Sequence, residues 1–237
     1  MDESVGQSSA ALSACTGNYI VSDNAAWPAA GCSSIAGNLT ISGSAVTSMR
    51  IFQGLRSVSG TLEITGTSLT NLTGFGAITG AIGGLKISDN PALTSFSGLG
   101  RLTYIGAVTI DGNGTLISLT GLEGITTINS LSVSYNDRLT NFVGLSGLTS
   151  MVGHVNVEHN GSLTSLQGLH NVQSVDGSLR IAENNMLTRC AMPGLDYVGG
   201  DLYVHDNPSL LTDYAYALAL TPVVAKPTTS HFIYNNL

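Results

Sequence analysis

Two carboxylates are the first residues in this sequence whose spacing could support a reaction. Asp111 and Glu158 each follow an alternating apolar segment, residues 108–110 and 155–157. If these segments stack as strands two rungs apart, their backbones would be about 9 to 10 Å apart, a separation that an inverting glycosidase can use. No further charged residue supports the pair, and the sequence contains no nucleophile elbow, phosphate-binding loop or metal-type histidine spacing. We therefore expect no enzyme, no catalytic residue, no metal and no cofactor.

A second set of polar residues lies in the C-terminal half, at positions expected to point outward from strands. Its members are Asn156, Glu158, Arg180, Tyr203 and His205, and His159 and Asp206 directly follow two of these strand positions. Amide, carboxylate, guanidinium, phenol and imidazole groups together can orient a polar ligand. We interpret this set as a candidate site for an extracellular protein or glycan, and ordinary solvated surface is the alternative.

A column of threonines recurs at the repeat spacing. The column comprises Thr47, Thr70, Thr94, Thr140, Thr164 and Thr188, and Ile117 interrupts it. Such an array resembles the ice-binding faces of solenoid antifreeze proteins, so an ice crystal surface is an alternative partner. The simpler interpretation is that threonine is favoured at exposed extended positions.

These residues must be positioned by a repeat of 23 or 24 residues. Its anchors are Leu39, Leu62, Leu85, Val108, Leu131, Val155, Leu179 and Leu202, and each is followed two residues later by Ile or Val. This alternation predicts one short strand per repeat. We expect a β-solenoid: a right-handed parallel β-helix or leucine-rich-repeat-like array of about eight coils.

A polar column three residues beyond each strand is predicted to point inward. It begins with Ser44 and Thr67 and continues with Asn90, Asn113, Asn136, Asn160, Asn184 and Asn207. Stacked amides can satisfy one another and the backbone, so we interpret the asparagines as a structural ladder. Glycines recur where each coil needs a positive φ or a tight corner; they are Gly98, Gly121, Gly144, Gly168 and Gly194.

Both ends of the array are predicted to carry caps. A disulfide between Cys15 and Cys32 would stabilise residues 1–36 by roughly 3 kcal/mol, whereas Cys190 falls in an apolar column and is expected to be buried. After the repeats, which span 37–211, Thr212 is expected to act as the N-cap of a helix that Pro222 ends. Residues 212–237 thus form a helical cap and a final partial rung in which Asn236 continues the ladder.

Composition limits the possible partners. The chain has 237 residues, a net charge of −7 and only 10% charged residues. Its basic residues are scattered, so nucleic acid is not an expected partner, and no apolar run is long enough to span a membrane. A disulfide indicates an oxidising compartment. We expect a secreted or cell-surface protein, without its own signal peptide in this sequence, and a monomer.

The cysteine arrangement at the start resembles a known family. Cys15, a segment of about sixteen residues, and Cys32-Ser-Ser-Ile-Ala-Gly-Asn-Leu-Thr-Ile are similar to the beginning of the receptor L domain, and the resemblance covers residues 15–237. The segments Asn90-Pro-Ala-Leu and Asn207-Pro-Ser-Leu look most like its microbial secreted and cell-surface members. No cysteine-rich module follows, so the growth-factor-receptor branch is not expected. The resemblance implies a scaffold for recognition or adhesion, not one shared activity.

Overall fold

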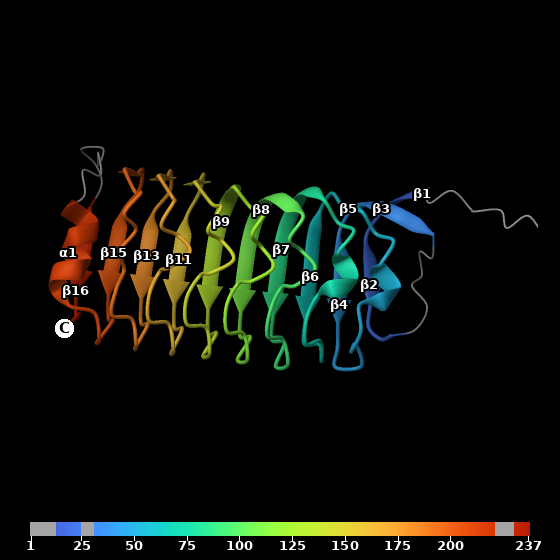
Figure 1. The fold of residues 1–237 in the computed structure, drawn as a ribbon, viewed down its shortest axis with the longest axis horizontal. Helices are drawn as coiled ribbons and strands as arrows, with labels where there is room; N and C mark the ends of the chain where they lie inside the picture. The colour runs from blue at the N-terminus through green and yellow to red at the C-terminus, as the bar shows by residue number, and fades with distance from the viewer. Residues whose placement is uncertain (1–12, 25–30, 221–229) are drawn as a thin grey trace, which may run out of the picture.

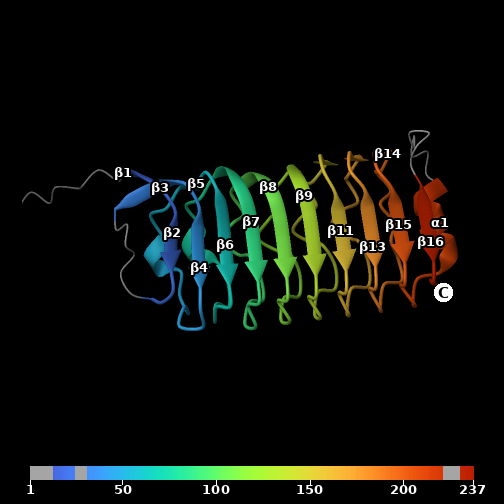
Figure 2. The same ribbon diagram turned by 180° about the vertical axis from the view of Figure 1, so that it is seen from behind.

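The chain winds into a parallel β-solenoid of about eight turns (Figure 1). The computed structural model describes residues 13–24, 31–220 and 230–237. The main sheet contains, in order, β2 Tyr19–Val21, β4 Leu39–Ser42, β6 Thr61–Thr65, β7 Gly80–Ser88, β8 Leu102–Asp111, β9 Thr127–Ser134, β11 Val155–Glu158, β13 Leu179–Ala182, β15 Leu202–His205 and β16 His231–Tyr234. These strands lie side by side along the molecule (Figure 2). The fold class expected from the repeat is confirmed.

Shorter elements complete each turn, and some of them join the main sheet through β9. The strands β1 Ser13–Thr16, β3 Cys32–Ala36 and β5 Ser57–Val58 form a separate parallel sheet, and β10 Ser150–Met151, β12 Ser174–Val175 and β14 Tyr197–Val198 pair in the C-terminal half. The helices are η1 Arg50–Phe52, η2 Thr73–Phe75 and α1 Thr212–Leu220. The rest of each turn is irregular, so only one side of the solenoid is a continuous flat sheet.

The core is made by the repeated apolar anchors. Leu39 pairs in register with Leu62, and Leu62 pairs with Leu85; the same register links Val155 to Leu179. Inward residues of each strand are buried, while the residues between them face outward. Because one turn cannot bury its own apolar side, the stability of each turn depends on contact with its neighbours.

The asparagine ladder is confirmed and has the same geometry in every rung. The Asn136 side chain donates through Nδ2 to the carbonyls of Ile110 and Ser134 (3.0 and 2.8 Å), and its Oδ1 accepts from the backbone N–H of Asn113 (3.1 Å). The six ladder asparagines are fully buried. Thr67 begins the ladder by donating to Asn90 Oδ1 (2.6 Å), and Asn236 ends it by accepting from Asn207. Ser44 is exposed, so its assignment to the inward column is wrong.

The residue before each ladder position turns the chain through the left-handed region. Glycine occupies this corner at Gly43, Gly66 and Gly112, and the last two have φ of 63° and 66°, close to the values of 52° to 56° at Asp89, Tyr135, His159, Glu183, Asp206 and Asn235. A side chain in this region costs about 1 to 2 kcal/mol, less for Asp and Asn. From Gly66 onward the corner therefore has nearly the same φ in every turn, whatever residue occupies it.

The recurring glycines lie where one turn touches the next. Gly98, Gly121, Gly144 and Gly168 have φ between 108° and 120°, and an added Cβ would lie about 2 Å from backbone atoms of the preceding turn. Gly194 lacks the positive φ, but its Cβ would approach the carbonyl of His170 to 2.8 Å. At each of these predicted corners, the glycine backbone therefore lies directly against the backbone of the preceding turn.

Both caps are present in the described residues. Cys15 and Cys32 form a disulfide with a Cα–Cα distance of 5.7 Å, which is an ordinary spacing. Helix α1 buries Ala215 and Leu218 over the last turn. The helix begins one residue earlier than predicted, because Leu211 supplies the first carbonyl, and the Thr212 hydroxyl instead donates to the carbonyl of Leu237 (2.7 Å). Pro222, expected to end the helix, lies outside the described residues.

Candidate functional site

The outer surface of the main sheet differs between its two halves. In the N-terminal half the outward side chains are mostly small, such as Thr40, Ser42 and Thr65, with one ion pair between Lys86 and Glu63 (2.7 Å). In the C-terminal half most of them are large and polar or aromatic, and Ala182 is the exception. We call the outward surface of β11, β13, β15 and β16 the C-terminal face. All five residues of the predicted polar set lie on it.

Arg180 is the centre of a hydrogen-bond network on this face. Its Nε donates to Glu158 Oε2 (3.1 Å), and Glu158 Oε1 accepts from the Asn156 amide (2.8 Å). Nη1 of Arg180 lies 2.9 Å from His205 Nε2. Because a guanidinium group can only donate, His205 accepts through Nε2 and donates through Nδ1 to Asp206 Oδ2 (2.7 Å). The network fixes one orientation for each side chain.

Two carboxylates in the network are held in their charged form. Burial alone would raise the pKa of Glu158, but hydrogen bonds from Asn156 and Arg180 outweigh it and lower the pKa below 4.5. The hydrogen bond from His205 lowers the pKa of Asp206, and Asn235 adds to this effect. With one guanidinium among these carboxylates, the face remains acidic.

Aromatic rings stack from rung to rung on the same face. Tyr203 lies against Phe232 with ring centroids 4.8 Å apart, and His205 lies against Tyr234 at 4.7 Å. Phe232 and Tyr234 belong to β16, the last strand, and they point to the same side because they are two residues apart. They remain 40% and 48% exposed. The last rung therefore presents two neighbouring rings at the end of the sheet.

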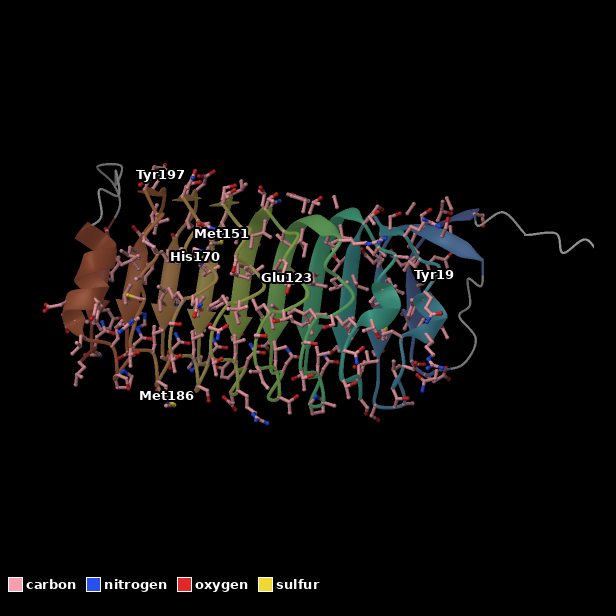
Figure 3. The ribbon with its side chains drawn as sticks, in the orientation of Figure 1. Tyr19, Glu123, Met151, His170, Met186 and Tyr197 are labelled. Carbon is pink, nitrogen blue, oxygen red and sulfur yellow. A yellow bond between two sulfur atoms is a disulfide. The ribbon has the colours of Figure 1, made fainter. Side chains whose placement is uncertain are left out.

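A shallow hollow lies beside these rings, at the edge where the strands turn. Its volume is about 580 Å³, and it is lined by His159, Glu183, Asn185, Asp206, Pro208 and Asn235. Figure 3 marks the same edge by Met186 and the opposite edge by Tyr197. His159 Nδ1 lies 3.3 Å from Glu183, and Asn235 donates to Asp206 (2.8 Å). Four of the lining residues, His159, Glu183, Asp206 and Asn235, occupy the left-handed corner position of their turn.

Sequence reasoning missed part of this site. It identified Asn156, Glu158, Arg180, Tyr203 and His205, but not Glu183, Asn235, Phe232 or Tyr234. A signal was available, because Asn236 marks the register of the last rung and thereby places the two aromatic residues in the outward columns. Helix α1 and residues 221–229 separate that rung from the regular repeat, so the step from Leu202 to His231 is 29 residues.

The threonine column lies on the irregular side of the solenoid, away from the C-terminal face. Three of its hydroxyls donate to backbone carbonyls of the preceding turn: Thr94 to Thr70 (3.1 Å), Thr164 to Thr140 (3.2 Å) and Thr188 to Thr164 (3.2 Å). Their donors are therefore used to hold adjacent turns together. Ile117, which interrupts the column, is 46% exposed.

The carboxylate pair considered for hydrolysis is already engaged. Asp111 accepts from Ser134 (2.5 Å), which lies between it and Glu158 in the outward column. Glu158 is bound by Asn156 and Arg180. Cys190 is buried and donates to the carbonyl of Tyr214, and burial raises the pKa of its thiol to about 11. The predicted structural role of Cys190 is confirmed.

The fold and the face together define a disulfide-capped β-solenoid with a polar and aromatic surface over its last rungs. In the described ranges, no helix is both long and apolar enough to cross a membrane, and no three metal-binding side chains converge. Comparison with protein-family models, curated proteins and solved structures finds no match for this chain. The similarity to receptor L domains therefore remains a prediction from the residues.

Proposed function

We propose that this protein is an extracellular recognition or adhesion module that binds a protein or glycan through the C-terminal face. The observation that carries the proposal is the Arg180 network, in which half-buried Glu158 and buried His205 hold one partly exposed guanidinium on the outward side of the sheet. Side chains fixed in this way lose little conformational entropy on binding. The disulfide supports an extracellular location.

The rigidity of the scaffold favours a ligand that is extended or repetitive. Adjacent rungs present groups about 4.8 Å apart, and the register between β11, β13, β15 and β16 is continuous. Aromatic side chains and arginine are also the residues most enriched at the energetic centres of interfaces. The N-terminal half of the sheet has the same backbone without these groups and provides an internal control.

The proposal is tested by binding to arrays of glycans and extracellular proteins. We expect a ligand that wild-type protein retains and that Arg180→Ala and Tyr203→Ala lose. Thr65→Ala, on the N-terminal half of the sheet, should bind normally. Loss of binding in Thr65→Ala, or retention in both face variants with unchanged stability, would contradict the proposal.

Ice binding through the threonine column is the second candidate function. The observation in its favour is that the backbone bonds of Thr94, Thr164 and Thr188 hold their hydroxyls in fixed positions at one rung spacing. We expect thermal hysteresis under this alternative, and its loss in Thr94→Tyr combined with Thr140→Tyr. Ice-crystal shaping that survives this double variant would exclude the column.

We also propose that the protein is not an enzyme and acts as a monomer. Asp111 and Glu158 are each already hydrogen-bonded to a neighbouring side chain, Ser134 and Asn156 respectively. Release of reducing sugar from polysaccharides that Asp111→Asn abolishes would overturn the first part. Light scattering that gives twice 24.4 kDa would overturn the second.

A further inference from the structure

We propose that the ligand is a neutral glycan, and that one sugar ring stacks on Phe232 and Tyr234 while its neighbours extend into the hollow lined by His159, Glu183, Asp206 and Asn235. The inference rests on the proposed function and names the ligand class of the same surface. It depends on three observations: an exposed pair of aromatic rings, a strained row of polar corners, and the charge of the site.

The rings of β16 form a stacking platform. Each ring has one side packed on the preceding rung, Phe232 on Tyr203 and Tyr234 on His205, with interplanar angles of 6° and 8°. Phe232 and Tyr234 remain 40% and 48% exposed. Their strand, β16, is the last of the sheet in the described residues, so no further strand packs against the other side of the rings. The C–H face of a sugar is apolar and carries weakly positive hydrogens, which suit the negative face of an aromatic ring. A sugar on this platform continues the existing stacks.

The corners beside the platform keep side chains where glycine would relieve strain. Three of the four corners in the N-terminal half are glycines, Gly43, Gly66 and Gly112, and the fourth is Asp89, whereas all five corners from Tyr135 to Asn235 carry side chains. Non-glycine residues in the left-handed region are uncommon and cluster at functional sites, and Asn, Asp and His adopt this region more readily than other residues do. Four of these five corner residues line the hollow. The strain therefore coincides with the proposed site.

The charge of the site selects a neutral glycan over an acidic one. Glu158, Glu183 and Asp206 surround the only arginine of the face, and Arg180 is already bound to Glu158 and His205, with Glu183 at 3.9 Å. The single guanidinium is thus outnumbered by three carboxylates, so a uronic acid or sulfate placed here would be repelled by the net negative charge. Carboxylates and the Asn235 amide instead accept and donate hydrogen bonds to sugar hydroxyls.

The test measures binding of the full chain to immobilised polysaccharides by affinity electrophoresis and calorimetry. The neutral probes are a soluble β-glucan, a galactomannan, an arabinoxylan and an arabinogalactan; polygalacturonate is the acidic probe and polylysine the cationic one. We expect a neutral polysaccharide to bind, with roughly tenfold weaker binding for Phe232→Ala or Tyr234→Ala. Phe232→Trp should retain or strengthen binding, and Thr65→Ala should match wild type. Thermal unfolding verifies that each variant is folded.

The outcomes separate this inference from the proposed function. Neutral-glycan binding that Arg180→Ala abolishes but Phe232→Ala and Tyr234→Ala leave intact would overturn the platform and keep the face. Binding only to polylysine or to a protein, lost in Arg180→Ala, would overturn the glycan inference while the proposed function stands. Preference for polygalacturonate would overturn the charge argument. Absence of binding to every probe and every arrayed protein would overturn both.

Discussion

The asparagine ladder gives the sharpest stability prediction, because Asn136→Ala removes one buried amide from the middle of the array. The substitution breaks five hydrogen bonds: from Nδ2 to Ile110, Ser134 and Asn160, and to Oδ1 from the backbone and side-chain amides of Asn113. Their donor–acceptor distances lie between 2.8 and 3.2 Å. No water can reach these groups easily, since Asn136 is fully buried.

The cost follows from which groups lose their partners. Asn113 Nδ2 keeps its bonds to the carbonyls of Ile87 and Asp111, but the Asn113 backbone N–H loses the acceptor on Asn136. One orphaned buried donor costs about 1 to 3 kcal/mol, and the other lost bonds bring the total to about 3 to 5 kcal/mol. For a domain of this size, that corresponds to a fall in Tm of roughly 10 °C.

Thermal and guanidinium unfolding followed by circular dichroism measure this effect. The matched control is Ser132→Ala, which removes an outward hydroxyl from the same turn and should change Tm by no more than about 1 °C. Because the repeats of a solenoid can unfold partly independently, the thermal and the guanidinium curves should each be checked for a single cooperative transition. A fall in Tm for Asn136→Ala no larger than that of the control would refute the reasoning that the ladder stabilises the stack.

Three further substitutions have expected outcomes. Gly121→Ala should destabilise the protein by more than about 1 kcal/mol, measured as a lower denaturation midpoint, because φ is 110° and the new Cβ would lie 2.2 Å from Phe96 backbone atoms. Glu183→Gly should raise stability by up to about 1 kcal/mol, because relieved corner strain exceeds the loss of exposed ion pairs, while weakening glycan binding; a lower Tm would contradict this. The lowered pKa of Glu158 implies that its contribution is present above pH 4.5 and is lost as the pH falls through its folded pKa, so the stability difference from Glu158→Gln should shrink in acid. A difference that grows on acidification would show that the sign is wrong.

The stacking of the turns was predictable from the sequence because the same stabilising residues recur in every turn. The apolar anchors and the asparagines recur every 23 or 24 residues, so each turn adds independent support for the same register. The pairing of Cys15 with Cys32 was also predictable, since both lie outside the repeat. The left-handed corner was not, because Gly66, Asp89 and Tyr135 share a backbone conformation without sharing a residue type.

The site was only partly predictable. Outward positions on β11, β13 and β15 follow directly from the alternation of each strand, which brought Arg180, Tyr203 and His205 together. The hydrogen bonds among them depend on rotamers, which the alternation does not specify. The platform of Phe232 and Tyr234 was missed because helix α1 interrupts the repeat before the final strand.

Amide NMR of the isotopically labelled chain, titrated with the ligand selected on the arrays, tests the central claim most directly. We expect shift changes that cluster on β11, β13, β15 and β16 and at the corners His159, Glu183, Asp206 and Asn235. Residues 39–65 of the same sheet should be unaffected. Shift changes centred on the threonine column or on the N-terminal half of the sheet would contradict it.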